Sequence, residues 1–516
     1  MILIKNWNFH HSFLLLLILT LMLSACSGDK LSVESTPDPL ISEAQASTQT
    51  SPASTPVTPE PTRLPVQPTI SPEQVEQDPG PVAYQLEADL DYSRHLLQVK
   101  QKLRIPHPGS VPLDELVLMV PPNDWPGVFQ VQRLAWKNGV EINEYSLERV
   151  TLTIPLEEPW NPGKVQELIL EYTLTLPVQN ARVGYGPSPF GYTQLQTNLV
   201  DWYAGVPPYQ EGEGWLVHEP WLFGEYLVYP AADFEVSLQI SNGPEMIVAA
   251  SGPVIQDGTV RTYRLEQARN FVLSLSPSYQ VFEGKVGETT VLGYHFPGYT
   301  NSGQAAFQTT MEALELYQEL YGPYQQETIS MIQADFNHGM EYEGLFYLSK
   351  AMFDVYNNSH RSYLIAIAAH ETAHQWWYGK VANDQALEPW LDESLCTFSE
   401  LAYYENLHPE VVDWWWQARI DFYQPEGPID GAIYDFAVPG GNNYEDYRQA
   451  IYLRGAEFQV QLREELGDER YYQFLRVYAA EMSNQVADGE DFFTLLGEYT
   501  EVEELPWLGE YFESKQ

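Results

Sequence analysis

His370-Glu371-Thr372-Ala373-His374 is the stretch from which the fold of this chain can be worked out. It follows an apolar run, residues 363–369, that is typical of a buried helix. Because an α-helix turns once every 3.6 residues, His370 and His374 lie one above the other on one face. Two imidazoles in that arrangement can bind one zinc ion, and Glu371 beside them can activate a water molecule. The stretch therefore predicts a zinc site on a buried helix.

A zinc ion that takes part in chemistry needs a third protein ligand and an open fourth position. Glu393, within residues 390–394 (Trp-Leu-Asp-Glu-Ser), can supply that ligand from a following helix. Structural histidines and an ordinary solvated acid are the alternative interpretations. A free carboxylate among apolar neighbours is costly to bury, which favours metal binding. We predict one Zn²⁺ per chain with the ligands His370, His374 and Glu393, and Glu371 as a catalytic residue.

These residues resemble the signature of the M1 aminopeptidases, zinc enzymes of the gluzincin group. That family carries H-E-x-x-H, eighteen residues and then Glu, and this chain matches it from His370 to Glu393 without a gap. Residues 374–379 (His-Gln-Trp-Trp-Tyr-Gly) also resemble the family. The resemblance implies a zinc-dependent aminopeptidase that hydrolyses the N-terminal peptide bond of peptides with a free N-terminus.

A second family motif lies upstream of the zinc helix. M1 enzymes carry Gly-x-Met-Glu-Asn on an edge strand of the cleft, where the Glu pairs with the substrate α-ammonium group. Gly339, Met340 and Glu341 fall in this motif, whereas His338 and Tyr342 stand at the outer Gly and Asn positions. Independently of the resemblance, a fixed carboxylate in a partly dry cleft binds an ammonium group and is left unpaired by an internal peptide bond. A surface acid is the alternative for Glu341.

Two further residues complete the site that the resemblance implies. Tyr452 stands in the context of the family's catalytic tyrosine, with Arg454 where Lys is usual, and a phenol there can donate to an oxyanion. Gln196, in residues 193–196 (Thr-Gln-Leu-Gln), matches a position that helps to hold the free amine. A packed core tyrosine and a solvated glutamine are the alternatives.

The helix predicted to carry Glu393 holds two more residues of interest. Glu400 lies two turns further on the same face and can orient a zinc-binding imidazole, although it can equally be an ordinary helical acid. Cys396 is predicted to be a small core residue. Cys26 is the only other cysteine, so we expect no disulfides.

The composition limits the classes of partner. The 516 residues include 71 acidic and 26 basic side chains, for a net charge of −45. Nucleic-acid binding requires basic surfaces that neutralise phosphates, so we expect no nucleic-acid partner. A length of 516 residues predicts two or three domains.

The N-terminal region indicates export. Residues 1–25 combine Lys5 with an apolar run too short to span a bilayer, as in a signal peptide. They end in Leu-Ser-Ala before Cys26, which resembles the lipobox of bacterial lipoproteins and implies membrane attachment through a lipidated Cys26. Residues 26–82 are rich in Ser, Thr and Pro and are predicted to form a disordered tether. We therefore expect an extracytoplasmic protein anchored to a bacterial membrane.

The remainder divides into two predicted domains of an α+β protein. Residues 83–285 show many short alternating segments, which predict an antiparallel β-sandwich or saddle. Residues 286–516 begin with a helical period at Phe307, Met311 and Leu314, and the resemblance implies a thermolysin-like, mainly helical catalytic domain. Full-length M1 enzymes continue into a helical-repeat domain over the cleft, and its absence from this sequence leads us to expect a more open site.

That expectation keeps other functions open. An endopeptidase of the same metal group is favoured by an open cleft. A catalytically inactive surface peptide-binding protein is a second alternative, against which no predicted catalytic position is substituted. Hydrolysis of a non-peptide substrate, known from one branch of the family, has no support in this sequence.

Overall fold

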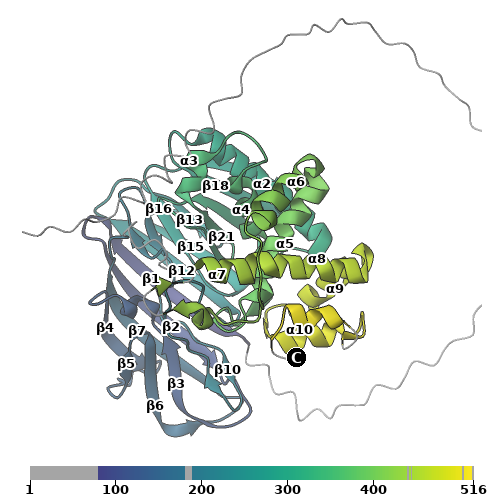
Figure 1. Ribbon diagram of the computed structural model, residues 1–516. Helices are drawn as coiled ribbons and strands as arrows, with labels where there is room; N and C mark the ends of the chain where they lie inside the picture. The colour runs from purple at the N-terminus through teal and green to yellow at the C-terminus, as the bar shows by residue number, and fades with distance from the viewer. Residues whose placement is uncertain (1–79, 180–188, 439–440, 443, 503–504, 514–516) are drawn as a thin grey trace, which may run out of the picture. The chain divides into compact units, whose positions relative to one another are not determined.

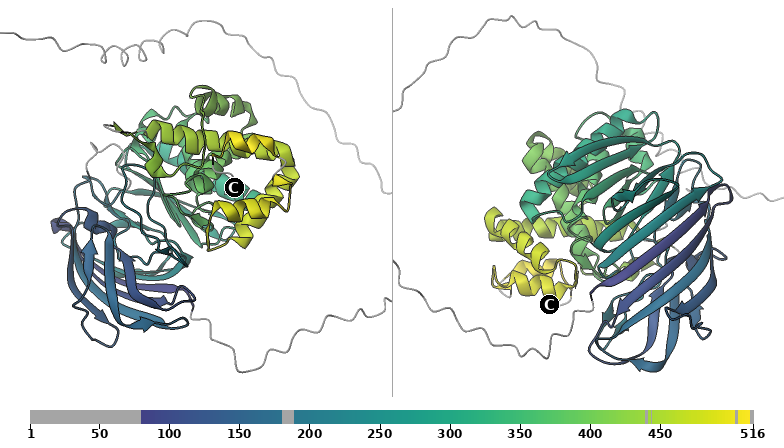
Figure 2. Two further views of the ribbon diagram at one scale, coloured as in Figure 1. Left: turned by 60° about the horizontal axis from the view of Figure 1, so that its bottom comes forward. Right: turned by 180° about the vertical axis from the view of Figure 1, so that it is seen from behind.

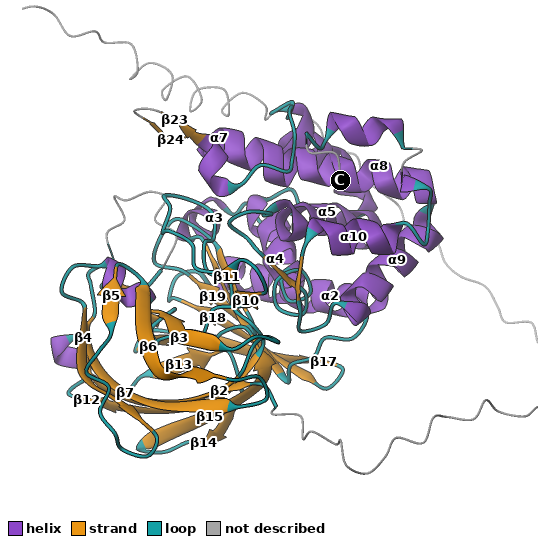
Figure 3. Ribbon diagram, turned by 90° about the horizontal axis from the view of Figure 1, so that it is seen from below, coloured by secondary structure: helices purple, strands orange, loops and turns teal. Residues whose placement is uncertain are grey.

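The computed structural model describes residues 80–179, 189–438, 441–442, 444–502 and 505–513. The predicted signal peptide, Cys26 and almost all of the predicted tether lie outside the described residues. Strands make up most of the N-terminal half and helices most of the C-terminal half, and the two kinds of element gather on different sides (Figure 1 and Figure 3). Within the part of the chain that is described, no helix combines the length and the apolar character needed to cross a membrane.

A seven-stranded sheet is the largest layer of the N-terminal half, with the strand order β14-β15-β12-β1-β2-β7-β4. Buried and accessible residues alternate along β1 (Val82–Asp91) and β12 (Ala232–Ser241), so one face of each strand enters the core. These two strands run parallel, which corrects the prediction of a purely antiparallel domain. The long segment between them allows the chain to return to the same end of the sheet. The other strands pair antiparallel: β2 (Leu96–Pro106), β4 (Phe129–Trp136), β7 (Val165–Thr175), β14 (Val254–Gln256) and β15 (Val260–Ala268).

Two smaller sheets share a hydrophobic core with this layer. The right-hand view of Figure 2 shows this sheet from behind, with its early strands in purple and blue and its later strands in teal. The β-rich half expected from the alternating sequence is therefore present. The smaller sheets consist of β3 (Leu113–Met119), β6 (Thr151–Trp160) and β5 (Ser146–Glu148), and of β13 (Ile247–Ala250), β16 (Leu273–Ser276), β9 (Thr197–Leu199) and β8 (Gly191–Tyr192).

A five-stranded mixed sheet opens the C-terminal half, in the order β17-β18-β19-β21-β20. Its central strand β19 pairs parallel with both neighbours, and β20 lies at the edge, as predicted for the strand that carries Glu341. The sheet begins with the β17–β18 hairpin, so the predicted boundary at 285/286 falls inside one structural unit. The strands are β17 (Gln280–Val286), β18 (Thr289–His295), β19 (Thr328–Gln333), β20 (Met340–Tyr342) and β21 (Leu345–Leu348).

Helices pack against this sheet and against one another around a second hydrophobic core. Phe307, Leu314 and Tyr317 of α2 (Thr300–Tyr321) are buried there, which confirms the helical period. The amphipathic helices expected near the C-terminus are also present. The remaining helices are α3 (Lys350–Val355), α4 (Tyr363–Ala373), α5 (Trp390–Leu407), α6 (Val412–Trp415), α7 (Tyr444–Tyr447), α8 (Gly455–Leu466), α9 (Asp468–Glu481) and α10 (Gly489–Leu496), with two π-helical segments, η4 (Trp416–Asp421) and η6 (Arg448–Arg454).

Arg269, which follows β15, joins the two halves. Its buried guanidinium group donates hydrogen bonds to the carbonyl oxygens of Gly379 (3.0 Å), Lys380 (3.1 Å) and Gln485 (2.9 Å). Its backbone N–H donates to the carboxylate of Glu343 (2.7 Å), directly after β20. Burial lowers the pKa of Arg269 to about 10, although the Glu343 carboxylate opposes that shift. The edge strand is thus fixed to the loop that follows the two histidines.

Candidate metal centre and substrate cavity

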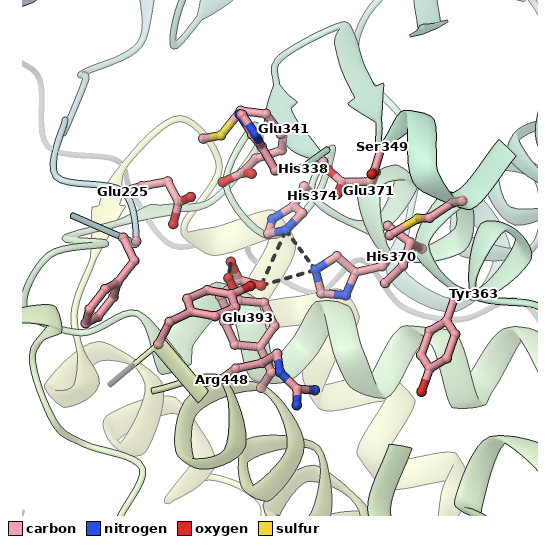
Figure 4. Close-up of a pocket in the computed structure, with 18 of the residues that line it drawn as sticks. Glu225, His338, Glu341, Ser349, Tyr363, His370, Glu371, His374, Glu393 and Arg448 are labelled. Atoms are coloured by element: carbon pink, nitrogen blue, oxygen red, sulfur yellow. Dashed lines mark hydrogen bonds and ion pairs between the residues drawn. The ribbon is translucent and has the colours of Figure 1, made fainter. Parts of the chain in front are cut away.

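Helices α4 and α5 bring the predicted metal ligands together. Ser362 caps α4 by accepting a hydrogen bond from the N–H of Leu364 (3.2 Å). His370 lies in the last turn of α4 and His374 directly after the helix, with 4.9 Å between ring centroids. Glu393 lies in the first turn of α5, which packs on α4. All three side chains point toward one spot in Figure 4.

The three donor atoms form a small triangle. His370 Nε2 lies 3.1 Å from Glu393 Oε2 and 3.2 Å from His374 Nε2. His374 Nε2 lies 3.6 Å from the same carboxylate oxygen. Tetrahedral ligands with Zn–N bonds of 2.0–2.1 Å stand about 3.3 Å apart. The triangle therefore has the size of one face of a zinc tetrahedron.

The second nitrogen of each imidazole fixes its tautomer. His370 Nδ1 lies 3.1 Å from Glu400 Oε1, and His374 Nδ1 lies 3.0 Å from the carbonyl oxygen of Trp377. A carbonyl and a carboxylate can only accept, so both Nδ1 atoms donate and both Nε2 lone pairs face Glu393. Three electron-rich atoms in contact need a cation between them. The residues present therefore fit zinc by donor chemistry as well as by spacing.

The electrostatics of the cluster agree with this fit. Burial lowers the pKa of His370, but hydrogen bonds to Glu393 and Glu400 outweigh it and raise the pKa to about 9. Burial likewise disfavours the Glu393 carboxylate, yet His374 and His370 bring its pKa down to about 2. Glu393 is thus an anion, and the cluster favours positive charge at this point.

Glu400 holds His370 from behind, as one of its two predicted roles requires. Its Oε1 also accepts a hydrogen bond from Arg419 (2.7 Å), and its Oε2 accepts one from the indole N–H of Trp415 (2.9 Å). All these groups are buried. The carboxylate therefore cannot turn away from the imidazole, and the ordinary helical acid is excluded.

Glu371 points from α4 into the cavity beside the ligands (Figure 4). Its Oε2 is buried and has no hydrogen-bond partner among the described residues. Burial raises the pKa of Glu371 to about 8, although His374 and His370 pull it down. A carboxyl group that titrates near neutrality can accept and return a proton, as the predicted catalytic role requires.

Tyr452 lies on the opposite side of the ligands, in η6. Its hydroxyl group donates to Glu393 Oε1 (2.5 Å), and its ring stacks on the imidazole of His370 with centroids 5.9 Å apart. Burial raises the pKa of Tyr452 well above the usual value, so the phenol keeps its proton. It is thus placed as a donor at the metal centre, as predicted.

Glu341 and Glu225 line the cavity close to the metal ligands. Glu341 is buried on β20, and its Oε1 accepts a hydrogen bond from the side-chain amide of Gln385 (3.0 Å). Glu225, between β11 (Gly214–Trp215) and β12, has a buried Oε2 without a partner among the described residues. Carboxylate oxygens of Glu225, Glu341 and Glu393 lie within 4.8 Å of one another. Burial raises the pKa of both Glu225 and Glu341, and a bound cation would stabilise their charged forms.

The cavity that connects these groups encloses about 1100 Å³, part of it open to solvent. Gly339 and Met340 line it together with Glu341, as predicted. Sequence reasoning missed Glu225, because it lies outside any motif and reaches the site only through the path of its loop.

Gln196 is the predicted site residue that the structure does not bring to this cavity. Its amide NH₂ group donates to the hydroxyl group of Tyr279 (2.5 Å) and to the carbonyl oxygen of Gln333 (3.2 Å). Its Oε1 accepts from the backbone N–H of Asp335 (3.0 Å). With its amide used inside the core, Gln196 is a structural residue. Cys396 is a buried free thiol, as predicted.

Comparison with known proteins agrees with this geometry. Residues 305–511 match the model of the Peptidase family M1 domain. Aminopeptidase M1-B of Oryza sativa subsp. japonica is 26% identical over 287 residues, which cover 52% of this chain and 32% of that protein. Endoplasmic reticulum aminopeptidase 1 of Homo sapiens is 27% identical over 201 residues, which cover 35% of this chain and 21% of that protein. The chain thus spans about a third or less of the length of these relatives.

Solved structures with the same fold cover more of the chain. A mutant M1 zinc metallopeptidase from Deinococcus radiodurans, bound to a Tyr-Ser-Ala substrate, superposes with a TM-score of 0.58 at 18% identity, over 84% of this chain and 95% of that one. The same comparison with the M1 zinc metallopeptidase from Deinococcus radiodurans gives a TM-score of 0.56 at 18% identity, over 82% and 92%. Residues 305–511 are therefore similar to the Peptidase family M1 domain, and the described residues share the fold of these solved metallopeptidases.

Proposed function

We propose that this protein is a zinc-dependent aminopeptidase that removes the N-terminal residue of peptides. The observation that carries the proposal is a pair of acids, the buried Glu341 and the half-buried Glu225, in the cavity that holds Glu371 and the metal ligands. A free α-ammonium group pairs with such acids through charge-assisted hydrogen bonds. An internal peptide bond would leave them unpaired, which is costly in a buried site.

Each side chain has a defined task in this proposal. His370, His374 and Glu393 would hold zinc, which would supply Lewis-acid chemistry to the attacking water and the scissile carbonyl group. Glu371 takes a proton from the attacking water and returns it to the leaving amine. The hydroxyl group of Tyr452 donates a hydrogen bond to the oxyanion.

Glu341 and Glu225, beside the metal ligands, set the position of the substrate. Glu341 and Glu225 hold the ammonium group close to the metal ligands, so only the first peptide bond reaches Glu371.

A panel of amino-acid amides, assayed with and without a chelator, tests this function. We expect hydrolysis that stops with the chelator and returns with Zn²⁺, and a loss of turnover in Glu371→Gln. N-acetylation of a peptide substrate should abolish its cleavage. Equal cleavage of free and acetylated peptides would instead indicate an endopeptidase, and full activity of Glu371→Gln would refute the mechanism.

We also propose that the protein is exported and held at a bacterial membrane by lipid on Cys26. The support is the sequence alone: an apolar signal that ends in Leu23-Ser24-Ala25-Cys26, followed by a Pro-rich segment. In a bacterial host, the full chain should enter the detergent phase on Triton X-114 partition and Cys26→Ala should not. Partition of Cys26→Ala with the detergent would refute the lipid anchor.

A further inference from the structure

A second cavity adjoins the end of the site where the two acids lie. It shares Glu225, Met340 and Glu341 with the first cavity and comprises about 460 Å³ of space, part of it open to solvent. Aromatic rings form most of its remaining wall: Trp125, Tyr226, Tyr229, Tyr342 and Tyr378. None of the described residues that line it is a lysine or an arginine.

Asp201 is the acid that lines the second cavity and not the first. Its side chain is 8% exposed and lines the space, and its Oδ1 accepts a hydrogen bond from the hydroxyl group of Tyr229 (3.0 Å). It forms no ion pair with any described residue. Burial raises the pKa of Asp201 to about 6, against the effect of Tyr229, so the carboxylate is charged at neutral pH. The backbone at Asp201 is left-handed, with φ of 47°, a costly conformation that concentrates at functional sites.

Two other polar atoms in the wall of the second cavity lack a hydrogen-bond partner among the described residues. The hydroxyl group of Tyr342 is buried without a hydrogen bond, in a residue only 3% exposed. Glu225 Oε2 is the other such atom, and it stands between the two cavities. Buried polar atoms are nearly always paired, so this wall is incomplete without a donor from a ligand.

We propose that this second cavity binds the side chain of the substrate's N-terminal residue and selects lysine and arginine, with Asp201 as the specificity-determining residue. The inference rests on the proposed function. When Glu341 and Glu225 hold the α-ammonium group, the side chain starts two bonds from the nitrogen, at Cβ, and can enter the adjoining cavity. The aromatic walls suit both the aliphatic stem and the cationic head, through cation–π attraction.

A cationic head would also complete the wall. It can donate to Asp201 and to the hydroxyl oxygen of Tyr342 at once, because ammonium and guanidinium groups carry three and five N–H donors. A methionine or leucine side chain would exclude water and leave the Asp201 carboxylate without a cation, with the hydroxyl group of Tyr229 as its hydrogen-bond donor. Sites built for a polar group discriminate strongly against analogues that lack it.

Amide substrates of lysine, arginine, methionine and leucine test the proposal through kcat/KM. We expect the wild type to prefer lysine over methionine by about 10- to 100-fold, the range of one hydrogen-bonded charge. In Asp201→Asn the ratio should fall to about 1, and in Tyr342→Phe it should fall several-fold. Asp89→Asn, the same exchange at an exposed position of β1, should keep the wild-type ratio. Zinc content and unfolding temperature show whether each variant is folded.

Binding measurements distinguish a failure of this inference from a failure of the proposed function. Calorimetry of Glu371→Gln with lysinamide and methioninamide measures selectivity without turnover, and adding Asp201→Asn should remove the preference for lysinamide. A wild type that prefers methionine or leucine, or a ratio unchanged by Asp201→Asn, overturns the role of Asp201. Selective binding of lysinamide without hydrolysis of any amide would refute the aminopeptidase and leave the cationic subsite standing.

Discussion

Gly339 lies directly against Glu371. A Cβ atom at position 339 would stand 2.5 Å from Glu371 Oε1 and 3.3 Å from the carbonyl oxygen of Tyr347. The residue before Met340 thus touches the proposed proton acceptor, so the motif that carries Glu341 also sets the position of Glu371. A larger side chain cannot be accommodated unless that carboxylate moves.

Gly339→Ala should therefore lower kcat/KM by about 100-fold, the usual cost of displacing a catalytic group by about 1 Å. Zinc should stay bound, because none of the three ligands is touched. Metal analysis and amide hydrolysis measure the two quantities. Gly509→Ala is the matched control, since a Cβ atom there meets nothing within 4 Å. Full activity in Gly339→Ala would show that Glu371 does not need its present position.

Glu225→Gln should raise KM for amino-acid amides and lower kcat/KM by about 10- to 100-fold, because the ammonium group loses one charged acceptor. Steady-state kinetics of single and double variants with Glu341→Gln would show whether the two acids act on one cation: their effects should then be less than additive. Glu219→Gln changes an exposed acid of the same loop and should behave as the wild type. Unaltered kinetics in Glu225→Gln would show that Glu225 does not bind the ammonium group.

Glu400→Gln should weaken zinc binding by about 10- to 100-fold, the usual effect of losing the acid behind a metal-bound histidine. It should also lower the unfolding temperature of the metal-free protein, because Arg419 loses a buried partner. Competition with a chelator measures the affinity. Glu405→Gln, on the same helix as Glu400, breaks an ion pair with Arg463 of α8 and should leave zinc affinity unchanged. Equal affinities in the two variants would contradict the orienting role.

Because of Glu388, we expect the free energy of unfolding to depend on pH. Burial raises its pKa from 4.5 to about 7, although the N–H of Gly489 lowers it. The folded state therefore holds this proton more tightly than the unfolded state, and the resulting stabilisation, present below pH 4.5, is lost as the pH rises through 7. We expect the loss to be about 2 kcal/mol between pH 5 and 8 and to be absent in Glu388→Gln. Urea unfolding at several pH values measures it, and parallel curves for the two proteins would contradict it.

The metal centre could be predicted from the sequence because its geometry is local. One helical turn separates His370 from His374, and the second helix brings Glu393 at the spacing of a known signature. Glu341 and Tyr452 were also predictable, since each stands in a motif. These residues depend on short segments whose shape is set by nearby residues.

Gln196 and Glu225 show where this reasoning fails. Gln196 has a suitable position in the sequence, but its amide is used by Tyr279, Gln333 and Asp335. Glu225 has no motif and reaches the cavity through the path of a long loop. The parallel pairing of β1 and β12 was not predicted either. The alternation of residues along a strand shows which face is buried, but it does not show whether the neighbouring strand runs parallel or antiparallel.

The contacts of Arg269 have a consequence for how the protein can be divided. Three carbonyl oxygens of the C-terminal half, at residues 379, 380 and 485, each accept a hydrogen bond from this one guanidinium group. A fragment that starts at residue 286 would expose those carbonyls and leave the acid after β20 buried without its cation. We therefore expect such a fragment to be less stable than the whole chain, because the strands before residue 286 hold β20 and the loop after His374 through Arg269.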